Sequence, residues 1–169
     1  GTLNEGALHA ALKRHYGGAE AQFEVPFSGF VADVVRDDTI FEIQTSTFSG
    51  LERKMRALAD QNPVVLVHPI AAQKNLVRIK DPASGDFTRR KSPKKGKLCH
   101  ILSELVYLPS LLNHPNFSVE VALIEEEQHS IYDPKARRGR GGWRTRGRHL
   151  VELLEQLRIN DVHLSLIHI

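Results

Sequence analysis

Hydrophobic residues recur first with a helical period and then with a strand period along the first half of the chain. Residues 3–16 place Leu8 and Leu12 on one helical face and predict a first helix. The runs that follow alternate or are continuously apolar, as in strands, except for one amphipathic stretch. Together they predict strands over residues 22–27, 29–36 and 39–45, a helix over 48–60, and strands over 64–70 and 75–80. This order, α-β-β-β-α-β-β, is typical of an α/β protein with a mixed β-sheet flanked by helices.

The second half of the chain predicts an α+β extension of this core. A broad apolar face over residues 97–112 predicts a helix, residues 117–127 predict a strand, and residues 148–157 predict an amphipathic helix. The predicted divisions are a core over residues 1–88, a basic loop over 89–97 and a C-terminal extension over 98–163 that includes a second basic segment over 135–148.

Basic residues are concentrated in those two segments. Of the 23 Lys and Arg residues, six lie in residues 89–97 and seven in residues 135–148, and neither segment contains an acid. The other positions hold ten basic residues against 20 acidic ones, so the net charge of +3 conceals an acidic body with two strongly basic segments. This distribution indicates a polyanionic partner, and nucleic acid is the leading candidate.

The composition is that of an ordinary globular protein, with 169 residues of which 41% are hydrophobic and 25% are charged. Cys99 is the only cysteine, which excludes an internal disulfide, and no apolar run approaches the roughly 20 residues that a bilayer requires. We therefore expect a cytoplasmic protein. Residues 164–169 (LSLIHI) resemble translated sequencing-adapter DNA, which predicts a scar at the end of a metagenomic gene that was cut short.

Two carboxylates are predicted to face each other across a hairpin. If residues 37–38 form a two-residue turn, Asp33 lies opposite Glu42, with apolar residues on both sides of each acid. Like charges at that spacing destabilise a sheet unless something neutralises them. Mg²⁺ or Mn²⁺ would do so, because both ions prefer carboxylate oxygens. Gln44, two residues beyond Glu42, is predicted to lie on the same face.

The order of these residues resembles that of the PD-(D/E)xK, or restriction endonuclease-like, nuclease superfamily, to which Holliday-junction resolvases and many restriction enzymes belong. The resemblance covers residues 3–80. It implies a restriction endonuclease-like core and a Mg²⁺- or Mn²⁺-dependent endonuclease that hydrolyses phosphodiester bonds, with a structure-specific, resolvase-like enzyme as one form. The residues that carry it are Glu5 on the first helix, Asp33 on one strand and Glu42-Ile43-Gln44 on the next.

The resemblance also implies a role for each of these residues. Asp33, Glu42 and the carbonyl oxygen of Ile43 would bind the metal ion, and Glu5 would reach it from the helix through water. Gln44 would help to place the attacking water, whose pKa the metal ion would lower.

Two positions depart from the superfamily pattern. Ala32 replaces the usual proline, a common variation, and Gln44 replaces the usual lysine. Some active members of the superfamily have this E-x-Q form, whereas in others the loss of the lysine accompanies a loss of catalysis. Arg53 and Lys54, early in the following helix, are candidates for supplying the missing positive charge, and His9 is a candidate neighbour of the site.

The two basic segments are expected to bind the nucleic-acid backbone. Arginine grips phosphates with two hydrogen bonds, and an aromatic ring such as that of Trp143 stacks on an unpaired base. Such contacts follow backbone and shape rather than sequence. The predicted nucleic-acid-binding residues are Arg89, Arg90, Lys91, Lys94, Lys95, Lys97, Arg137, Arg138, Arg140, Trp143, Arg144 and Arg146.

Other interpretations stay open at this point. The main one is a catalytically inactive nucleic-acid-binding module on a nuclease-like scaffold, because Gln44 stands in place of lysine. The two acids also fit a solvent-facing hairpin, and Glu5 also fits a capping box with Thr2. RNA is an alternative to DNA as the substrate. The apolar face over residues 98–112 is a candidate homodimer surface, within a longer segment that is a candidate face for a further domain or partner.

Overall fold

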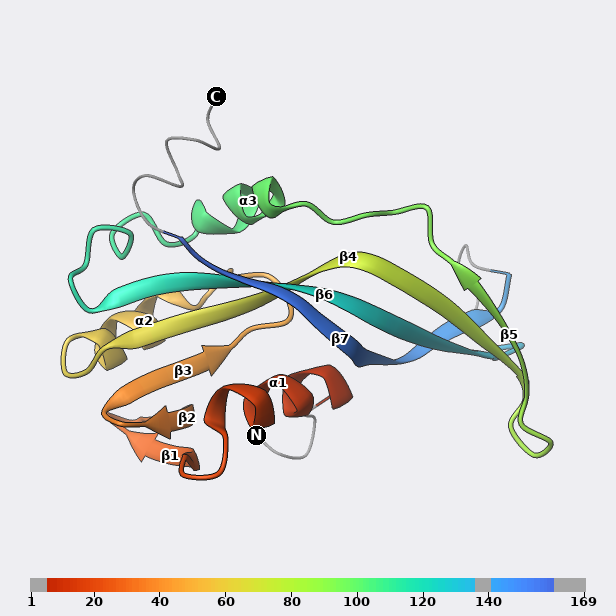
Figure 1. Cartoon of the computed structure of the whole chain (residues 1–169), viewed down its shortest axis with the longest axis horizontal. Coiled ribbons are helices and arrows are strands. Elements are labelled where there is room, and N and C mark those ends of the chain that lie inside the picture. The colour runs from red at the N-terminus through yellow and green to blue at the C-terminus, as the bar shows by residue number, and fades with distance from the viewer. Residues whose placement is uncertain (1–5, 136–140, 160–169) are drawn as a thin grey trace.

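The computed structural model describes residues 6–135 and 141–159, which form a seven-stranded mixed sheet with short helices on both faces (Figure 1). In chain order its elements are α1 (Ala7–Gly17), β1 (Gln22–Phe27), β2 (Phe30–Arg36), β3 (Thr39–Ile43), α2 (Glu52–Ala59), β4 (Val64–Asp81), β5 (Asp86–Lys91), the 3₁₀ helix η2 (Leu98–Ile101), α3 (Leu102–Leu105), β6 (Phe117–Tyr132) and β7 (Trp143–Ile159). The predicted α/β class with a mixed sheet flanked by helices is confirmed. None of the helices in these residues has the length and apolarity needed to cross a membrane.

The β2–β3 hairpin has the predicted turn and register. Asp37 and Asp38 both have positive φ, 48° and 63°, as the two central residues of a type I′ turn require. Val35 pairs with Ile40 across the two strands. The turn therefore fixes the alignment of the residues farther along the hairpin, where the predicted acid pair lies.

The sheet is organised around β4. β3 leads through α2 into β4 and runs parallel to it, while β6 pairs in parallel with the other edge of β4. β7 pairs with β6, and β5 pairs with the outer half of β4, beyond the end of β3. The strand order is β1-β2-β3-β4-β6-β7, so the strands of residues 117–159 belong to the same sheet as the predicted core.

Two hydrophobic clusters fill the space between the sheet and its helices. Ile40 and Phe41, consecutive residues of β3, belong to different clusters because successive side chains of a strand point to opposite faces. On the Phe41 face, α1 packs Leu8 and Leu12 against the sheet. On the Ile40 face the cluster contains residues of the loop before α2, of α2 itself, of η2 and α3, and of the turns that follow, namely Phe48, Met55, Leu58, Ile101, Leu105, Leu108 and Leu111. α1 and α2 therefore cover opposite faces of the sheet.

The outer part of the sheet extends beyond the helices as a four-stranded arm (Figure 1). We define the arm as residues 74–81 of β4, 86–91 of β5, 125–132 of β6 and 143–149 of β7. Every residue of β5 is exposed. Both faces of β5, at the edge of the arm, are therefore accessible to ligands.

Two predicted strands, over residues 64–70 and 75–80, are one continuous strand. A register shift lies between Ala71 and Gln73, but the pairing with β6 continues beyond it to Ile79. No glycine interrupts residues 71–74, and the long partner strand β6 holds them extended.

The helix predicted over residues 148–157 is wrong, because these residues form part of β7. Leucine and glutamate favour helices locally, but here each pairs with a residue of β6, as Leu157 does with Val121 and Glu155 with Leu123. Tertiary pairing overrides a weak local preference.

The segment between β5 and β6 also differs from the prediction. Instead of one helix over residues 97–112, the chain forms η2, α3 and then turns with i→i+3 hydrogen bonds, such as that from the amide of Leu111 to the carbonyl of Leu108. These turns keep an apolar residue facing the core about every third position, so they satisfy the pattern that predicted a helix. Residues 89–91, predicted as a loop, form the end of β5.

Candidate functional site

Asp33 and Glu42 lie together where the β2–β3 ladder ends. The amide of Asp33 donates to Oε1 of Glu42 at 3.0 Å, and the amide of Ile43 donates to Oδ2 of Asp33 at 2.9 Å. Each carboxylate thus binds the backbone of the opposite strand. Their side chains are only 13% and 5% exposed, so the predicted buried pair is confirmed and the solvent-facing hairpin is not.

His9 reaches this pair from α1. Its Nε2 lies 2.9 Å from the carbonyl oxygen of Ile43 and 3.4 Å from Oδ2 of Asp33. The imidazole therefore joins the end of β3 to the carboxylate of β2.

Lys54 reaches the pair from α2, on the other face of the sheet. Its Nζ lies 3.0 Å from Oε2 of Glu42. Of the two predicted sources of positive charge, Lys54 is the one that contacts the acids. Its approach follows from the amphipathic α2 helix, which buries Met55 and Leu58 and holds Lys54 half-buried at the edge of the core.

The two carboxyl groups have opposite pKa shifts. Burial, together with the neighbouring charge of Asp33, raises the pKa of Glu42 to about 7, although Lys54 opposes the change. Burial also acts to raise the pKa of Asp33, but the hydrogen bonds from His9 and the Ile43 amide outweigh it and hold that pKa below its ordinary value. Near neutral pH the pair therefore carries between one and two negative charges, and a nearby cation would favour the state in which both carboxyl groups are ionised.

Gln44 does not join the acid pair. Its side-chain amide donates to the carbonyl of Thr47 at 2.8 Å and to the hydroxyl of Ser46 at 3.1 Å, so it closes the loop after β3. Its own carbonyl oxygen lies 2.6 Å from Nδ1 of His68, a mostly buried residue of β4. Glu5, the other predicted ligand, lies outside the described residues.

A small cavity of about 270 Å³ lies beside His9. It is bounded by the first residues of α1, by Thr45 and by residues 145–148 of β7. Arg148, one of its lining residues, binds the fully buried Glu126 with two hydrogen bonds and also donates to the carbonyl of Thr45. Arg148 and Glu126 are 22 positions apart, so no local pattern marks this buried ion pair in the sequence.

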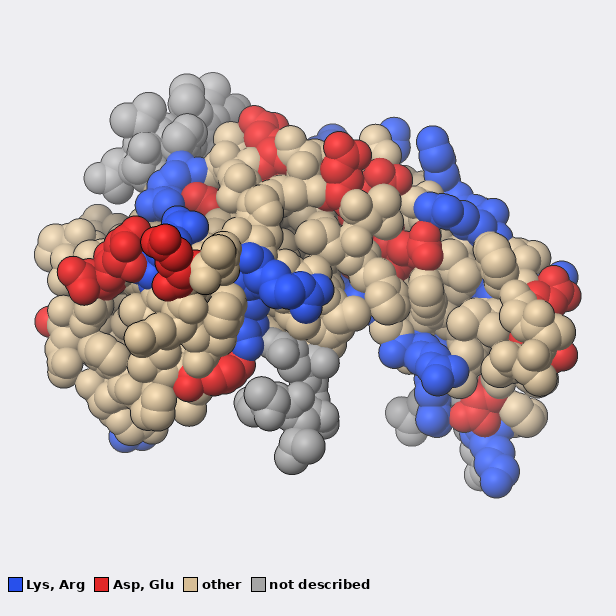
Figure 2. All heavy atoms as spheres, turned by 60° about the horizontal axis from the view of Figure 1, so that its bottom comes forward, with Lys and Arg blue, Asp and Glu red and all other residues tan. Residues whose placement is uncertain are grey.

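The predicted nucleic-acid-binding residues lie mainly on the arm. Arg89, Arg90 and Lys91 are on β5, and Trp143, Arg144 and Arg146 are on β7, which places both basic segments on one structure. Figure 2 shows groups of Lys and Arg side chains that stand out over the arm, toward the right of the view. Lys94, Lys95 and Lys97 follow β5, and Arg137, Arg138 and Arg140 lie outside the described residues.

The arm has a large polar cavity of about 740 Å³ on one face. Lys74, Arg78, Arg90 and Lys94 line it together with Trp143. The guanidinium carbon of Arg78 lies 4.9 Å from the centre of the Trp143 ring, which is a cation–π contact. Arg78 belongs to β4 and lies outside both basic segments, so the charge pattern of the sequence did not predict this contact. The cavity combines four basic side chains, of which Lys74 pairs with Glu126, with an aromatic ring, as a surface for a nucleic-acid backbone would.

Comparison with known proteins gives the family of the chain. Residues 6–160 match the family described as a domain of unknown function, DUF8091. The chain is 34% identical over 137 residues to an uncharacterized protein of Treponema pallidum (strain Nichols), in a match that covers 80% of this chain and 54% of that protein. The chain thus spans about half the length of the curated relative that it matches, and no solved structure matches it. On the extent of the family match, this chain belongs to the DUF8091 family.

Proposed function

We propose that this domain is a metal-dependent nuclease that hydrolyses phosphodiester bonds in DNA, built on a restriction endonuclease-like core of α1, β1–β3, α2 and β4. The observation that carries the proposal is the buried pair of Asp33 and Glu42, with Lys54 and His9 beside it. Burying two carboxylates together costs free energy, and paired acids with perturbed pKa values are typical of catalytic sites.

The donor atoms fit a cation such as Mg²⁺ or Mn²⁺. Asp33 and Glu42 offer carboxylate oxygens and Ile43 a carbonyl oxygen, the ligands that such ions prefer. His9 Nε2 lies within 3.4 Å of two of these oxygens, so they converge on a point that a positive group can occupy. Among the described residues there is no group of three or more His, Cys, Asp and Glu side chains suited to a metal ion. Water and a substrate phosphate would therefore complete the coordination, with Glu5 as a further ligand.

A bound metal ion would polarise the scissile phosphate and lower the pKa of the attacking water. In this chain Lys54 takes the place of the motif lysine, because its ammonium group is the positive charge that contacts Glu42. The ammonium group favours the ionised form of Glu42 and adds positive charge where a phosphate would bind. His9 holds the carboxylate of Asp33 and the end of β3 in place.

The arm supports DNA as the substrate. The basic residues that were predicted to bind the backbone project from the same sheet as the acid pair, and Arg146 lines the cavity beside His9. A backbone held along the arm would thus lead toward the acids. The binding would depend strongly on salt concentration and weakly on base sequence.

A catalytically inactive nucleic-acid-binding module is the second candidate. It is favoured by the position of Gln44, whose side chain binds the loop after β3 rather than the acids. In this interpretation Lys54 and His9 neutralise the acid pair permanently, and the nuclease-like core serves as a scaffold for the arm.

The test is cleavage of labelled single-stranded, duplex, flap and four-way-junction DNA in Mg²⁺, in Mn²⁺ and in chelator. We expect metal-dependent cleavage that Asp33→Asn and Glu42→Gln each reduce by about 100-fold or more, since each removes charge at the reacting centre. Lys54→Arg should retain more activity than Lys54→Ala. Glu155→Gln, an exposed acid on β7, is the matched control and should cleave normally.

One result would contradict the assignment of the site to the acid pair, and another would contradict the nuclease proposal itself. Cleavage that persists unchanged in both Asp33→Asn and Glu42→Gln would assign the activity to another site. Salt-dependent binding with no cleavage of any substrate, in either metal, would favour the inactive module.

A further inference from the structure

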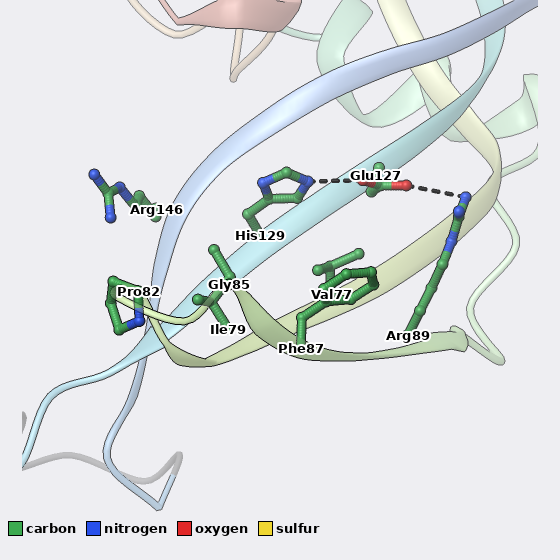
Figure 3. A pocket seen from close by; sticks show the side chains of 9 residues that line it. All are labelled: Val77, Ile79, Pro82, Gly85, Phe87, Arg89, Glu127, His129 and Arg146. Atoms are coloured by element: carbon green, nitrogen blue, oxygen red, sulfur yellow. Dashed lines mark hydrogen bonds and ion pairs between the residues drawn. The ribbon is translucent and has the colours of Figure 1, made fainter.

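A third pocket, of about 370 Å³, also lies on the arm (Figure 3). Its walls come from β4, β5, β6 and β7 and from the β4–β5 turn, so hydrogen-bonded strands hold most of its shape. A preformed concave site of this size is in the range that small ligands and single residues of a polymer occupy. The lining residues are Val77, Ile79, Pro82, Gly85, Phe87, Arg89, Glu127, His129 and Arg146.

One side of the pocket is apolar and aromatic. Val77, Ile79 and Phe87 contribute hydrocarbon surface, and Phe87 is 58% exposed. A large ring on an edge strand that stays in water gains free energy when a ligand covers it. The exposed ring therefore favours a ligand with a flat apolar face.

The rest of the pocket is lined mainly by polar side chains, and some of their charges are paired with one another (Figure 3). Glu127 accepts from His129 Nε2 at 2.7 Å and pairs with the guanidinium of Arg89 at 2.9 Å, so its negative charge is already neutralised. Arg146 lies at the opposite end of the pocket and has no ion pair with any described residue. The ring of Phe87 thus lies between two guanidinium groups, and the positive charge of Arg146 is the one that no described acid balances.

A flat apolar face between positive charges is the chemistry of a nucleotide. Bases stack on aromatic side chains irrespective of sequence, and guanidinium groups bind phosphates. A base inside a duplex is covered by its neighbours on both faces, so only an unpaired base can stack on Phe87. An apolar peptide segment would use the same ring but would gain nothing from Arg89 and Arg146.

The pocket also lies on a path to the acid pair. Arg146 lines both this pocket and the cavity beside His9, so one strand of nucleic acid can touch both. Glu42 pairs with Leu66 across β3 and β4, and Val77 is eleven positions farther along β4. At about 3.3 Å per residue the separation along β4 is at most about 36 Å, or about eleven steps of duplex DNA at 3.4 Å each.

We infer that the pocket beside Phe87 binds one unpaired nucleotide of the nucleic acid, with its base stacked on Phe87 and adjacent phosphates on Arg89 and Arg146. The inference rests on the proposed function for the identity of the ligand as nucleic acid, but not for catalysis. It names the substrate class more closely: a duplex with an unpaired nucleotide within about one helical turn of the acid pair.

The test is binding of a duplex that ends in a short overhang carrying 2-aminopurine, whose fluorescence falls when it stacks. The wild-type chain is used in chelator, so that no cleavage occurs. We expect quenching, and tighter binding than to the blunt duplex. Phe87→Ala should abolish the quenching and weaken binding by about 5- to 100-fold, the usual range for loss of one base–aromatic contact. Phe87→Tyr should retain both.

Two further variants separate stacking from general effects. Arg146→Gln should weaken binding of the overhang duplex more than of the blunt one, because its phosphate contact lies at the pocket. Tyr107→Ala removes another exposed ring, outside the arm, and should change neither signal. Competition by a free mononucleotide at concentrations that displace the overhang would identify a soluble nucleotide as the ligand and overturn the strand assignment.

The failures of the two proposals are distinguishable. Equal binding of blunt and overhang duplexes, unaffected by Phe87→Ala, would overturn the pocket inference while leaving the nuclease proposal intact. Quenching that requires Phe87, in a protein that cleaves nothing, would overturn the nuclease proposal alone. Binding of no nucleic acid at all would overturn both.

Discussion

Asp33 and Glu42 receive donors from both faces of the sheet. His9 comes from α1 and Lys54 from α2, so a shift of either helix changes the charge of the pair. Glu42, with its pKa raised to about 7, is the member whose charge depends on its surroundings at neutral pH. A phosphate or metal ion near the pair would act first on this residue.

His68 is a second residue whose charge makes the stability depend on pH. Burial lowers its pKa, although its hydrogen bond to Gln44 opposes the change. The unfolded chain therefore takes up a proton at higher pH than the folded chain does. The stability that neutral His68 contributes is complete above its ordinary pKa of about 6.5 and is lost as the pH falls below it.

We expect His68→Asn, which keeps a donor near Nδ1, to lose less stability than the wild type between about pH 7.5 and 5.5. The measurement is the urea midpoint at both pH values. His100→Asn alters an exposed histidine and should follow the wild type. A wild-type midpoint that falls no more than that of His68→Asn would rule out this contribution.

Among the elements, the connection from β5 to η2 depends on a close approach of two backbones. Gly96 donates its amide to the carbonyl of Ala71 at 2.8 Å. A Cβ on Gly96 would lie 2.8 Å from that oxygen and 2.5 Å from the side chain of Ile70. Only glycine lets the connection lie so close to β4.

Gly96→Ala should therefore lower the free energy of unfolding by about 1–3 kcal/mol, the usual cost of overpacking. Chemical denaturation followed by circular dichroism measures it. Gly6→Ala is the control, because no atom lies within 4 Å of its added Cβ, and it should change stability by less than about 0.5 kcal/mol. Equal stability of the two variants would show that the connection can move away from β4 at little cost.

The sequence predicted correctly the elements whose structure depends on neighbouring residues. The prediction failed for elements whose structure depends on pairing with distant segments. The β2–β3 hairpin and its acid pair were predictable because a two-residue turn and strand alternation fix the register within a few residues. β7 was mistaken for a helix because its leucines and glutamates carry a helical signal, and only pairing with β6 makes it a strand. Lys54 was predictable as a candidate, whereas the contacts of Arg148 and Gln44 depend on the loop after β3.

In the whole molecule, the two basic segments meet on the arm although they are about 40 positions apart in the chain. Phosphate binding releases counterions, so the affinity for DNA should fall steeply with salt. Replacing Arg90 and Lys94 together by glutamine should reduce the slope of log K against log salt by about 2, at about 0.9 per phosphate contact. Fluorescence anisotropy across a salt series measures this slope.

Arg56→Gln, on α2 and away from the arm, is the control and should leave the slope unchanged. The expectation fails if the double variant and the control have the same slope, because DNA would then be held elsewhere on the molecule.

The length of β4 has a consequence for how this family can vary. β4 pairs with β6 over almost its whole length, and β6 in turn pairs with β7, so the three strands form one ladder from the helices to the tip of the arm, with one register shift between β4 and β6 and three between β6 and β7. An insertion that no bulge absorbs leaves the side chains of that strand on the wrong face unless the neighbouring strands change as well. Relatives should therefore gain or lose residues in turns such as 82–85, and a change in arm length should appear as matched changes in all three strands.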